Sequence, residues 1–253
     1  GGAAQHAAPE AAEAQGESDT PPTENGQAQQ EQEAKEAQIT PTQTVTPEPT
    51  DDPTDPAVLQ KLDQWRDLKF GVLFHWGLYS VPGTFESWLL CSEEKFIPRR
   101  TKIFGDMPYD DFKKWYWGLS ESFNPTKFAP EVWADIMKDA GMKYVILVAK
   151  HHEGFCLWDS KYTEYDVANS GNKTNVIEEV AKACKKYDIG LGLYYSLWDR
   201  KVNADVKDKT LDAAYNEYMI KQLNELIDIV QPYTHIVEFW FDGGWEKEHE
   251  RWP

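Results

Sequence analysis

Four short apolar segments recur along residues 57–253, and each one ends in polar or aromatic side chains. The clearest runs from Tyr144 to Ala149 and gives way abruptly to His151 and His152. A run this short, rich in β-branched residues and preceded by a helix stop at Gly141, predicts a strand covered on both faces. The other predicted strands are Phe70–Phe74, Ile189–Tyr194 and Ile236–Phe241.

Amphipathic helical patterns lie between these segments. The pattern over Pro130–Ala140 begins with proline and stops at Gly141, and its apolar face consists of Val132, Trp133, Ile136 and Met137. The pattern over Asn175–Tyr187 has Asn175 as its N-cap and Glu178 three residues later, as in a capping box. Further helices are expected over Val58–Asp67, Tyr109–Gly118 and Leu211–Val230, with Tyr109–Gly118 inside a loop-rich segment that reaches Phe123.

The alternation of strands and helices predicts a parallel sheet with right-handed crossovers. Its strands end at His75, His151, Tyr194 and Asp242, at the carboxyl edge where parallel α/β folds place their sites. An open, flavodoxin-like sheet would share this feature, but the pattern favours a (β/α)8 TIM-like barrel. A complete barrel needs about 250 residues. We therefore expect residues 57–253 to be the N-terminal part of a truncated barrel domain, with about half of its strands.

Residues 1–56 differ in composition from the rest of the chain. They contain twelve acidic residues, one lysine, eight prolines and no aromatic residue. Such a segment buries too little apolar surface to offset the entropy of ordering it, so we expect a disordered acidic tether rich in Pro, Thr, Gln and Ala. Tethers of this kind suggest an extracytoplasmic setting, either secreted, periplasmic or surface-tethered.

The bulk properties argue against several other functions. The net charge of −17 and the absence of a basic stripe disfavour nucleic-acid binding. No apolar run approaches the length that a membrane span needs. Cys91, Cys156 and Cys184 lack the spacing of a disulfide framework or a zinc knuckle, so they are expected to be buried or idle thiols. The sequence gives no indication of the oligomeric state.

Candidate chemistry gathers at the strand ends. Asp242 follows an apolar strand and precedes Gly243 and Gly244, so its carboxylate can be a nucleophile, a general base or a metal ligand. The chain has eleven tryptophans, and indole faces stack well on sugar rings. Five lie near strand ends or in the following loops: Trp76, Trp88, Trp158, Trp240 and Trp245. Together with histidine, tyrosine and carboxylate groups, they indicate a monosaccharide pocket.

Four motifs carry a specific resemblance. They are FGVLFHWGLYSVP at residues 70–82, AKHHEGFCLWDS at 149–160, GLYYS at 192–196 and WFDG at 240–243. In this order and at this spacing they resemble the α-L-fucosidases of glycoside hydrolase family 29. The resemblance covers residues 65–246. It implies a retaining exo-α-L-fucosidase that releases terminal α-linked L-fucose from fucosylated glycans, on a (β/α)8-like barrel and without a metal or other cofactor.

The resemblance also implies roles for individual residues. Asp242 matches the nucleophile that attacks the anomeric carbon, and Trp240 matches a wall near the methyl group of fucose. The sugar hydroxyls are held by residues matching His75, His151, His152 and Tyr194. Trp88 and Glu86 fall where the family often has Glu-Trp, and the intervening serine departs from that pattern. Leu73 stands where the family usually has phenylalanine.

A retaining glycosidase needs a second carboxyl group as acid/base. By resemblance that group follows Pro253, so we expect this chain to be inactive or barely active by itself. Two other functions remain open: a non-catalytic fucose-binding protein, and an amidohydrolase-type barrel holding a metal through His75, His151, His152 and Asp242. Amidohydrolase barrels typically begin with a His-x-His strand, which this chain lacks. A transfucosidase would share every residue seen here.

Overall fold

The computed structural model describes residues 55–253 except residues 92–95 and 204. Residues 1–54 of the expected tether lie outside the described residues. The described body begins with α2 (Pro56–Leu68), whose N-terminus is capped by the Asp55 side chain.

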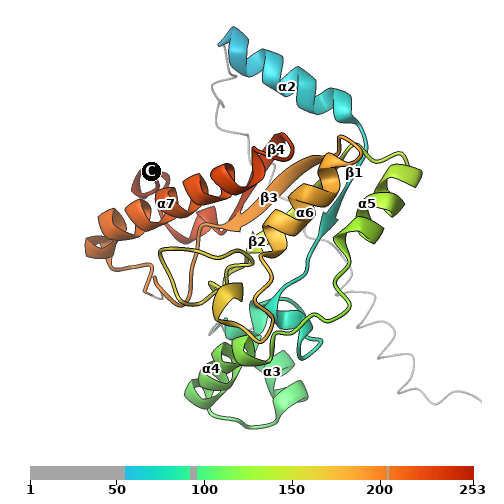
Figure 1. Cartoon of the computed structure of the whole chain (residues 1–253). Helices are drawn as coiled ribbons and strands as arrows, with labels where there is room; N and C mark the ends of the chain where they lie inside the picture. Colours follow the sequence, from blue (N-terminus) through green and yellow to red (C-terminus); the bar gives the residue numbers. More distant parts are fainter. Residues whose placement is uncertain (1–54, 92–95, 204) are drawn as a thin grey trace, which may run out of the picture. The chain divides into compact units, whose positions relative to one another are not determined.

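The centre of the body is a sheet of four parallel strands in the order β1-β2-β3-β4 (Figure 1). Each strand pairs with its sequence neighbour, and the register sets Leu147 beside Phe74 and Leu193, and Ser196 beside Asp242. The carboxyl ends of all four strands therefore meet at one edge. The strands are β1 (Gly71–Phe74), β2 (Tyr144–Lys150), β3 (Gly190–Ser196) and β4 (Ile236–Asp242).

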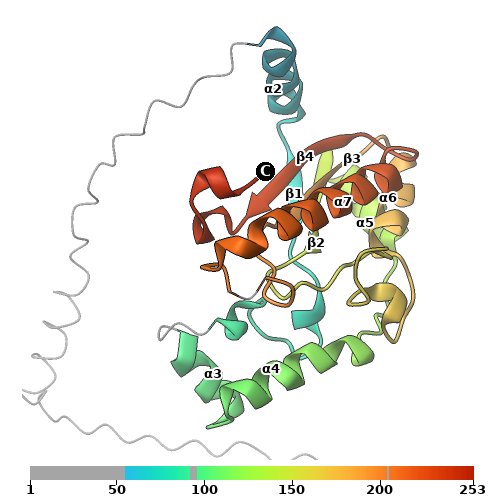
Figure 2. The ribbon, with the colours of Figure 1, turned by 90° about the vertical axis from the view of Figure 1, so that its left-hand side faces the viewer.

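The crossover helices α5 (Pro130–Asp139), α6 (Val176–Lys185) and α7 (Asp212–Val230) lie side by side along one face of the sheet (Figures 1 and 2). A doubly wound sheet would reverse its strand order and carry helices on both faces. Sequential strands with helices on one face are the arrangement of a (β/α)8 barrel. The barrel interpretation is therefore confirmed over the flavodoxin-like alternative.

Between β1 and α5 the chain makes a long excursion beyond the carboxyl end of β1 (Figure 1). It contains α4 (Tyr109–Gly118), as expected, and also α3 (Ile97–Phe104), which the loop-rich pattern did not indicate. The sequence of α3 has a proline near its start, and half of its eight residues are polar. Its only buried residue is Arg100, which donates to the backbone carbonyls of Leu89 and Cys91.

Two expectations about the crossover helices are wrong in detail. Asn175 caps α6 by accepting from the Glu178 amide, but the Glu178 side chain contacts Lys182 and Tyr233 instead of completing a capping box. In α5, Val132 and Ile136 are exposed although the sequence places them on the apolar face. The strand that α5 covers through the contact of Trp133 with Phe74 is β1, which lies at the edge of the sheet, and α6 packs beside α5 on the inner side.

The core is densest around β2 and β3, whose residues are buried on both faces, as expected for central parallel strands. Cys91, Cys156 and Cys184 are all buried and none of them forms a disulfide, as expected from their spacing. In the part of the chain that the structure describes, no helix combines the length and the apolar character needed to cross a membrane.

A buried charge pair links the end of β2 to the loop that follows β3. The Lys150 ammonium donates to Asp199 Oδ2 at 3.1 Å, to Gln222 Oε1 at 3.1 Å and to the Tyr195 hydroxyl at 2.9 Å. Asp199 Oδ1 accepts in turn from the amides of Lys201 and Val202. Neither side chain of the Lys150–Asp199 pair is exposed to solvent.

Glycine at position 154 makes this link possible. Gly154 has φ +86°, and a Cβ there would lie 2.4 Å from Asp199 Oδ1. The backbone amide of Arg200 also donates to the His152 carbonyl at 2.8 Å. The turn after β2 and the loop after β3 therefore pack as one unit.

Replacing Lys150 with methionine should strand the Asp199 carboxylate in the core and lower the free energy of unfolding by about 3–5 kcal/mol. Lys182 is a matched control, because it bridges Glu178 and Glu179 at a site where 43 % of its side chain is exposed. Lys182→Met should cost less than about 1 kcal/mol. Urea denaturation of both variants measures the difference. Equal losses would show that the Asp199 carboxylate does not need Lys150 as its buried partner.

Candidate active site

The residues that the sequence singles out at the strand ends meet in one place. His75 follows β1, His151 and His152 follow β2, and Tyr194 lies in β3. The ring centroids of His75 and Tyr194 are 5.2 Å apart, and His151 stacks on Tyr194 with centroids 5.3 Å apart and planes 7° apart. The His151 and His152 rings are 4.4 Å apart. These four rings lie within the span of one sugar ring and its hydroxyls.

Asp242 closes this cluster from the end of β4. One of its oxygens, Oδ2, accepts a hydrogen bond from the Tyr194 hydroxyl and lies 3.8 Å from His152 Nε2. The other, Oδ1, accepts from the Gly243 amide at 2.8 Å. Gly243 has φ +80°, the left-handed region that favours glycine, and a Cβ there would lie 3.1 Å from Trp198. The carboxylate is thus oriented by its neighbours, while 20 % of its side chain is exposed.

The proton of His152 is placed by its neighbours. The Ser196 hydroxyl donates to the Trp198 carbonyl, so at its 2.5 Å contact with His152 Nδ1 it accepts. Nδ1 therefore carries the proton. His152 Nε2 is buried and has no hydrogen-bond partner among the described residues. Burial, with repulsion from neighbouring cationic groups, lowers the pKa of His152 to about 2, so the ring is neutral and Nε2 offers a lone pair to the pocket.

A second carboxylate, Glu86, faces the same imidazoles from the loop after β1. Glu86 Oε1 lies 3.6 Å from His75 Nε2, and Oε2 lies 3.4 Å from His151 Nε2. The Trp88 indole donates to Glu86 Oε2 at 2.9 Å. Glu86 has φ +44°, which costs energy for a residue with a side chain and is typical of functional sites. The structure thus brings both Glu86 and Trp88 to the cluster.

Ser87, which the sequence marks only as a departure, is fully buried and contacts His151 Nδ1 through its hydroxyl at 2.5 Å. The insertion of one residue between Glu86 and Trp88 therefore fixes an imidazole of the site. Ser196 and Trp198 were also missed, although Ser196 lies inside the GLYYS motif. Their roles depend on hydrogen bonds from across the sheet edge, which spacing along the chain does not reveal.

The tryptophans divide into two groups. The Trp88 ring lies 4.9 Å from that of His152, edge to face. Trp240 is half exposed and shares a strand face with Asp242 two residues later, but it is absent from the ring contacts that join the cluster in the described part of the chain. Trp158 is fully buried, and Trp76 packs against Phe128 and Trp133, so these two belong to the core rather than to a sugar site.

Electrostatics keeps the pocket rich in hydrogen-bond acceptors. A hydrogen bond from His151 is the main cause that lowers the pKa of Glu86, which favours its anion. Burial lowers the pKa of His75 and so favours its neutral ring. Burial also raises the pKa of the Tyr194 hydroxyl, which stays protonated and donates to Asp242. Behind the pocket, burial raises the pKa of Glu153.

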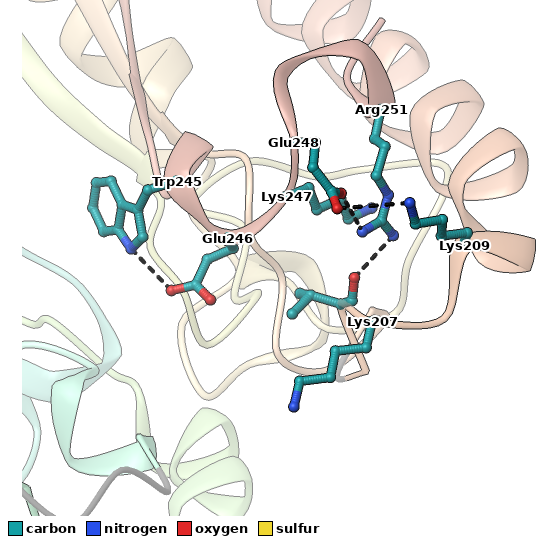
Figure 3. Close-up of a pocket in the computed structure, with 8 residues that line it drawn as sticks. Lys207, Lys209, Trp245, Glu246, Lys247, Glu248 and Arg251 are labelled. Carbon is teal, nitrogen blue, oxygen red and sulfur yellow. Dashed lines mark hydrogen bonds and ion pairs between the residues drawn. The ribbon is translucent and has the colours of Figure 1, made fainter.

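The segment that follows Asp242 is clamped to the first turn of α7. Asp212 accepts from Lys247 at 2.7 Å and from Arg251 at 2.7 Å. Arg251 also donates to Glu248 and to the Val206 carbonyl (Figure 3). An open cavity of about 460 Å³ lies beside this clamp. Its lining residues are Val206, Lys207, Lys209, Trp245, Glu246, Lys247, Glu248 and Arg251 (Figure 3). The clamp fixes the backbone just downstream of the candidate nucleophile.

Two sets of side chains in the described residues have the ligand types and spacing of metal sites. One is His75, Glu86 and His151, and the other is His151, His152 and Asp242. The same groups suit a sugar, since each can accept a hydrogen bond from a hydroxyl. An oriented carboxylate among neutral imidazoles can attack an electrophilic carbon, and the surrounding acceptors can hold the hydroxyls next to it.

The low pKa of His152 gives a testable pH dependence. Its folded value of about 2 lies below the unfolded value of about 6.5, so the stability it contributes is present above pH 6.5 and is lost as the pH falls. Between pH 7 and pH 5 this loss should reach about 2 kcal/mol. His152→Asn keeps a hydrogen-bond donor for Ser196 and removes the titrating ring. Between pH 7 and pH 5, the free energy of unfolding of this variant should therefore fall by about 2 kcal/mol less than that of the unchanged protein. If chemical denaturation gives the same dependence of unfolding free energy on pH for both proteins, the His152 ring is not held neutral by the fold.

Known proteins resemble this chain in both sequence and fold. Residues 37–253 match the family model described as Alpha-L-fucosidase. Alpha-L-fucosidase 1 of Arabidopsis thaliana is 42 % identical over 163 residues, which cover 62 % of this chain and 29 % of that protein. Human plasma alpha-L-fucosidase is 33 % identical over 199 residues, covering 76 % of this chain and 42 % of that protein. The chain thus spans less than half the length of these relatives.

A solved structure agrees with the sequence comparison. It is a trapped covalent intermediate of a family 29 alpha-L-fucosidase from Bacteroides thetaiotaomicron in complex with 2-fluoro-fucosyl fluoride. The two structures align with a TM-score of 0.59 and 34 % sequence identity over 77 % of this chain and 43 % of that one. By the extent of the family match and the shared barrel strands, this chain belongs to the α-L-fucosidase family of glycoside hydrolases.

Proposed function

We propose that this chain carries the nucleophile and the sugar-binding side of a retaining exo-α-L-fucosidase that acts on fucosylated glycans. The main support is the convergence of Asp242 with three imidazoles and Tyr194 from four different strand ends. Family membership supports the substrate class, and the relative trapped as a covalent intermediate supports the retaining route. An Asp242 carboxylate oxygen attacks the anomeric carbon, and water then hydrolyses the glycosyl-enzyme.

The hydrogen bonds to Asp242 serve both halves of this reaction. Tyr194 and the Gly243 amide hold the carboxylate in one orientation, so little entropy is lost when the sugar approaches. The same donors stabilise the carboxylate as it leaves in the second step. Because the Tyr194 hydroxyl stays protonated, it remains a donor throughout.

The acceptors around Asp242 select for sugar hydroxyls. His152 Nε2 presents a lone pair, and the Glu86 carboxylate lies between His75 and His151. A sugar hydroxyl that donates to one of these groups offsets the free energy of burying it. A molecule without hydroxyls would leave the buried acceptor without a hydrogen bond. Trp240 is assigned to the wall near the methyl group of fucose. Hydrolysis and transfucosylation use the same covalent intermediate, and the acceptor decides between them.

The setting that we propose is extracytoplasmic, whether secreted, periplasmic or tethered to a surface. The acidic Pro/Thr-rich composition of residues 1–56 supports it, and one relative is named a plasma enzyme. A metal-dependent amidohydrolase is a poorer fit, since the family match and the aromatic surroundings of the pocket both point to sugar chemistry. A protein that only binds sugar would not need the hydrogen bonds that hold the Asp242 carboxylate in one orientation.

Covalent labelling tests the nucleophile directly. 2-Fluoro-fucosyl fluoride carries a leaving group that departs without protonation, so its reaction needs Asp242 but no acid/base. Incubation should add one fluorofucosyl group to the peptide that contains Asp242, as measured by mass spectrometry. Asp242→Asn should remain unlabelled while still binding L-fucose. A label on another residue, or equal labelling of the variant, would show that the assignment is wrong.

Dependence on the leaving group tests the proposal that the acid/base carboxyl is not part of this chain. Without that acid, an aryl α-L-fucoside with an acidic phenol should react, whereas methyl α-L-fucoside should not turn over measurably. General acid catalysis typically supplies a factor of about 10²–10⁴. Rates for the two substrates, measured with this chain and with Asp242→Asn as the blank, decide the matter. Fast hydrolysis of the methyl glycoside would locate an acid/base within the 253 residues.

A further inference from the structure

His75, Glu86 and His151 bring two imidazoles and one carboxylate to the same point of the pocket. Glu86 oxygens lie 3.6 Å from His75 Nε2 and 3.4 Å from His151 Nε2, and one ligand atom from each of the three residues lies within 4.8 Å of the others. Two ligands of a tetrahedral zinc ion, each bonded at about 2.0–2.1 Å, lie about 3.4 Å apart. Each imidazole already lies at about this distance from its nearer Glu86 oxygen. Since one ligand atom of each residue lies within 4.8 Å of the others, movements of at most about 1.4 Å bring all three to one ion.

Each of these side chains is held by a neighbour that leaves a ligand atom facing the pocket. Ser87 contacts His151 Nδ1, so Nε2 faces Glu86, and the Trp88 indole bonds one oxygen of Glu86. The ring of Tyr194 packs edge to face on His75 and stacks on His151. Metal-bound histidines commonly have such a partner on the other ring nitrogen. The ligands therefore need little ordering when an ion arrives.

The site is also reachable from solvent. About 29 % of the His75 side chain and 23 % of the Glu86 side chain are exposed, whereas His151 is buried. Two nitrogens and one oxygen suit zinc and similar transition ions rather than calcium or magnesium, which prefer oxygen ligands only. Three protein ligands with an open position form the pattern of an exchangeable zinc site.

We propose that His75, Glu86 and His151 form a binding site for a divalent transition-metal ion, Zn²⁺ foremost, that excludes the sugar from the pocket and so inhibits the enzyme. The metal site follows from the geometry alone. The exclusion of sugar rests on the proposed function, because the same three groups are assigned there to the hydroxyls. Zinc and fucose would therefore bind in competition.

The second set, His151, His152 and Asp242, is the weaker candidate. The distance from His152 Nε2 to Asp242 Oδ2 is longer, at 3.8 Å, and that oxygen of Asp242 already accepts from Tyr194. Both sets contain His151, so a variant at His151 does not distinguish them. Glu86 and Asp242 each belong to one set only.

Titration of the 253-residue chain with Zn²⁺ in a calorimeter, and with Co²⁺ by visible absorption, tests the site. We expect one ion per chain and the visible bands of four- or five-coordinate Co²⁺. Glu86→Gln should weaken binding by about 100-fold or more, and Ser87→Ala by about 10-fold, since even outer contacts to a ligand matter by 10–100-fold. Asp242→Asn and, as a surface control, His249→Ala should change binding less than about threefold. Circular dichroism confirms that each variant is folded.

Loss of binding in Asp242→Asn but not in Glu86→Gln would overturn the proposal in favour of the other set. Loss of Zn²⁺ binding in His249→Ala would also overturn it. The absence of Zn²⁺ binding up to about 1 mM, a Kd equivalent to only about 4 kcal/mol of binding free energy, would do the same. L-Fucose should raise the apparent Kd for Zn²⁺. If Glu86→Gln abolishes metal binding and L-fucose does not compete with Zn²⁺, the proposal that the ion and the sugar share one site is wrong. Labelling of Asp242 by the fluorofucosyl reagent reports separately on the proposed function.

Discussion

The geometry of the site depends on a buried lock between the turn after β2 and the loop after β3. Lys150 and Asp199 form its charged part, and Gly154 leaves the space that the Asp199 carboxylate occupies. The lock holds His152 against Ser196 and sets Trp198 beside Gly243. A buried ion pair is costly to desolvate, so its value here is in specifying one arrangement of two loops rather than in added stability. Asp242 takes its position from that arrangement.

The same surroundings decide what the pocket can bind. Burial keeps His152 neutral, and the hydroxyl of Ser196 assigns its proton to the ring nitrogen that points away from Asp242. Glu86 is held as an anion by the imidazole next to it. The imidazoles and carboxylates of this cluster present several lone pairs and few protons. Such groups can accept hydrogen bonds from the hydroxyls of a ligand, and the same lone pairs can bind a transition-metal ion. The recognition of a sugar and the binding of a metal ion that we propose therefore depend on one set of acceptors.

The barrel strands and the convergence of their ends were predictable, because apolar runs of strand length and parallel crossovers follow from local pattern. His75, His151, Tyr194 and Asp242 lie at strand ends, and parallel strands bring such ends together whatever their separation in sequence. The exposure of Val132 and Ile136 was not predictable, since it depends on which elements lie beside α5. Ser87, Ser196 and Asp199 were missed for a related reason. Their partners lie on other strands and loops, and nothing in the local pattern of a serine or an aspartate reveals a contact across the sheet edge.

A crystal structure of this chain with L-fucose bound would show whether one sugar lies among side chains from four strand ends. We expect the anomeric carbon about 3–3.5 Å from an Asp242 carboxylate oxygen, with ring hydroxyls donating to His152 Nε2 and to Glu86. Fucose bound elsewhere, or bound there with Asp242 remote from the anomeric carbon, would show that Asp242 is not the nucleophile of a fucose site.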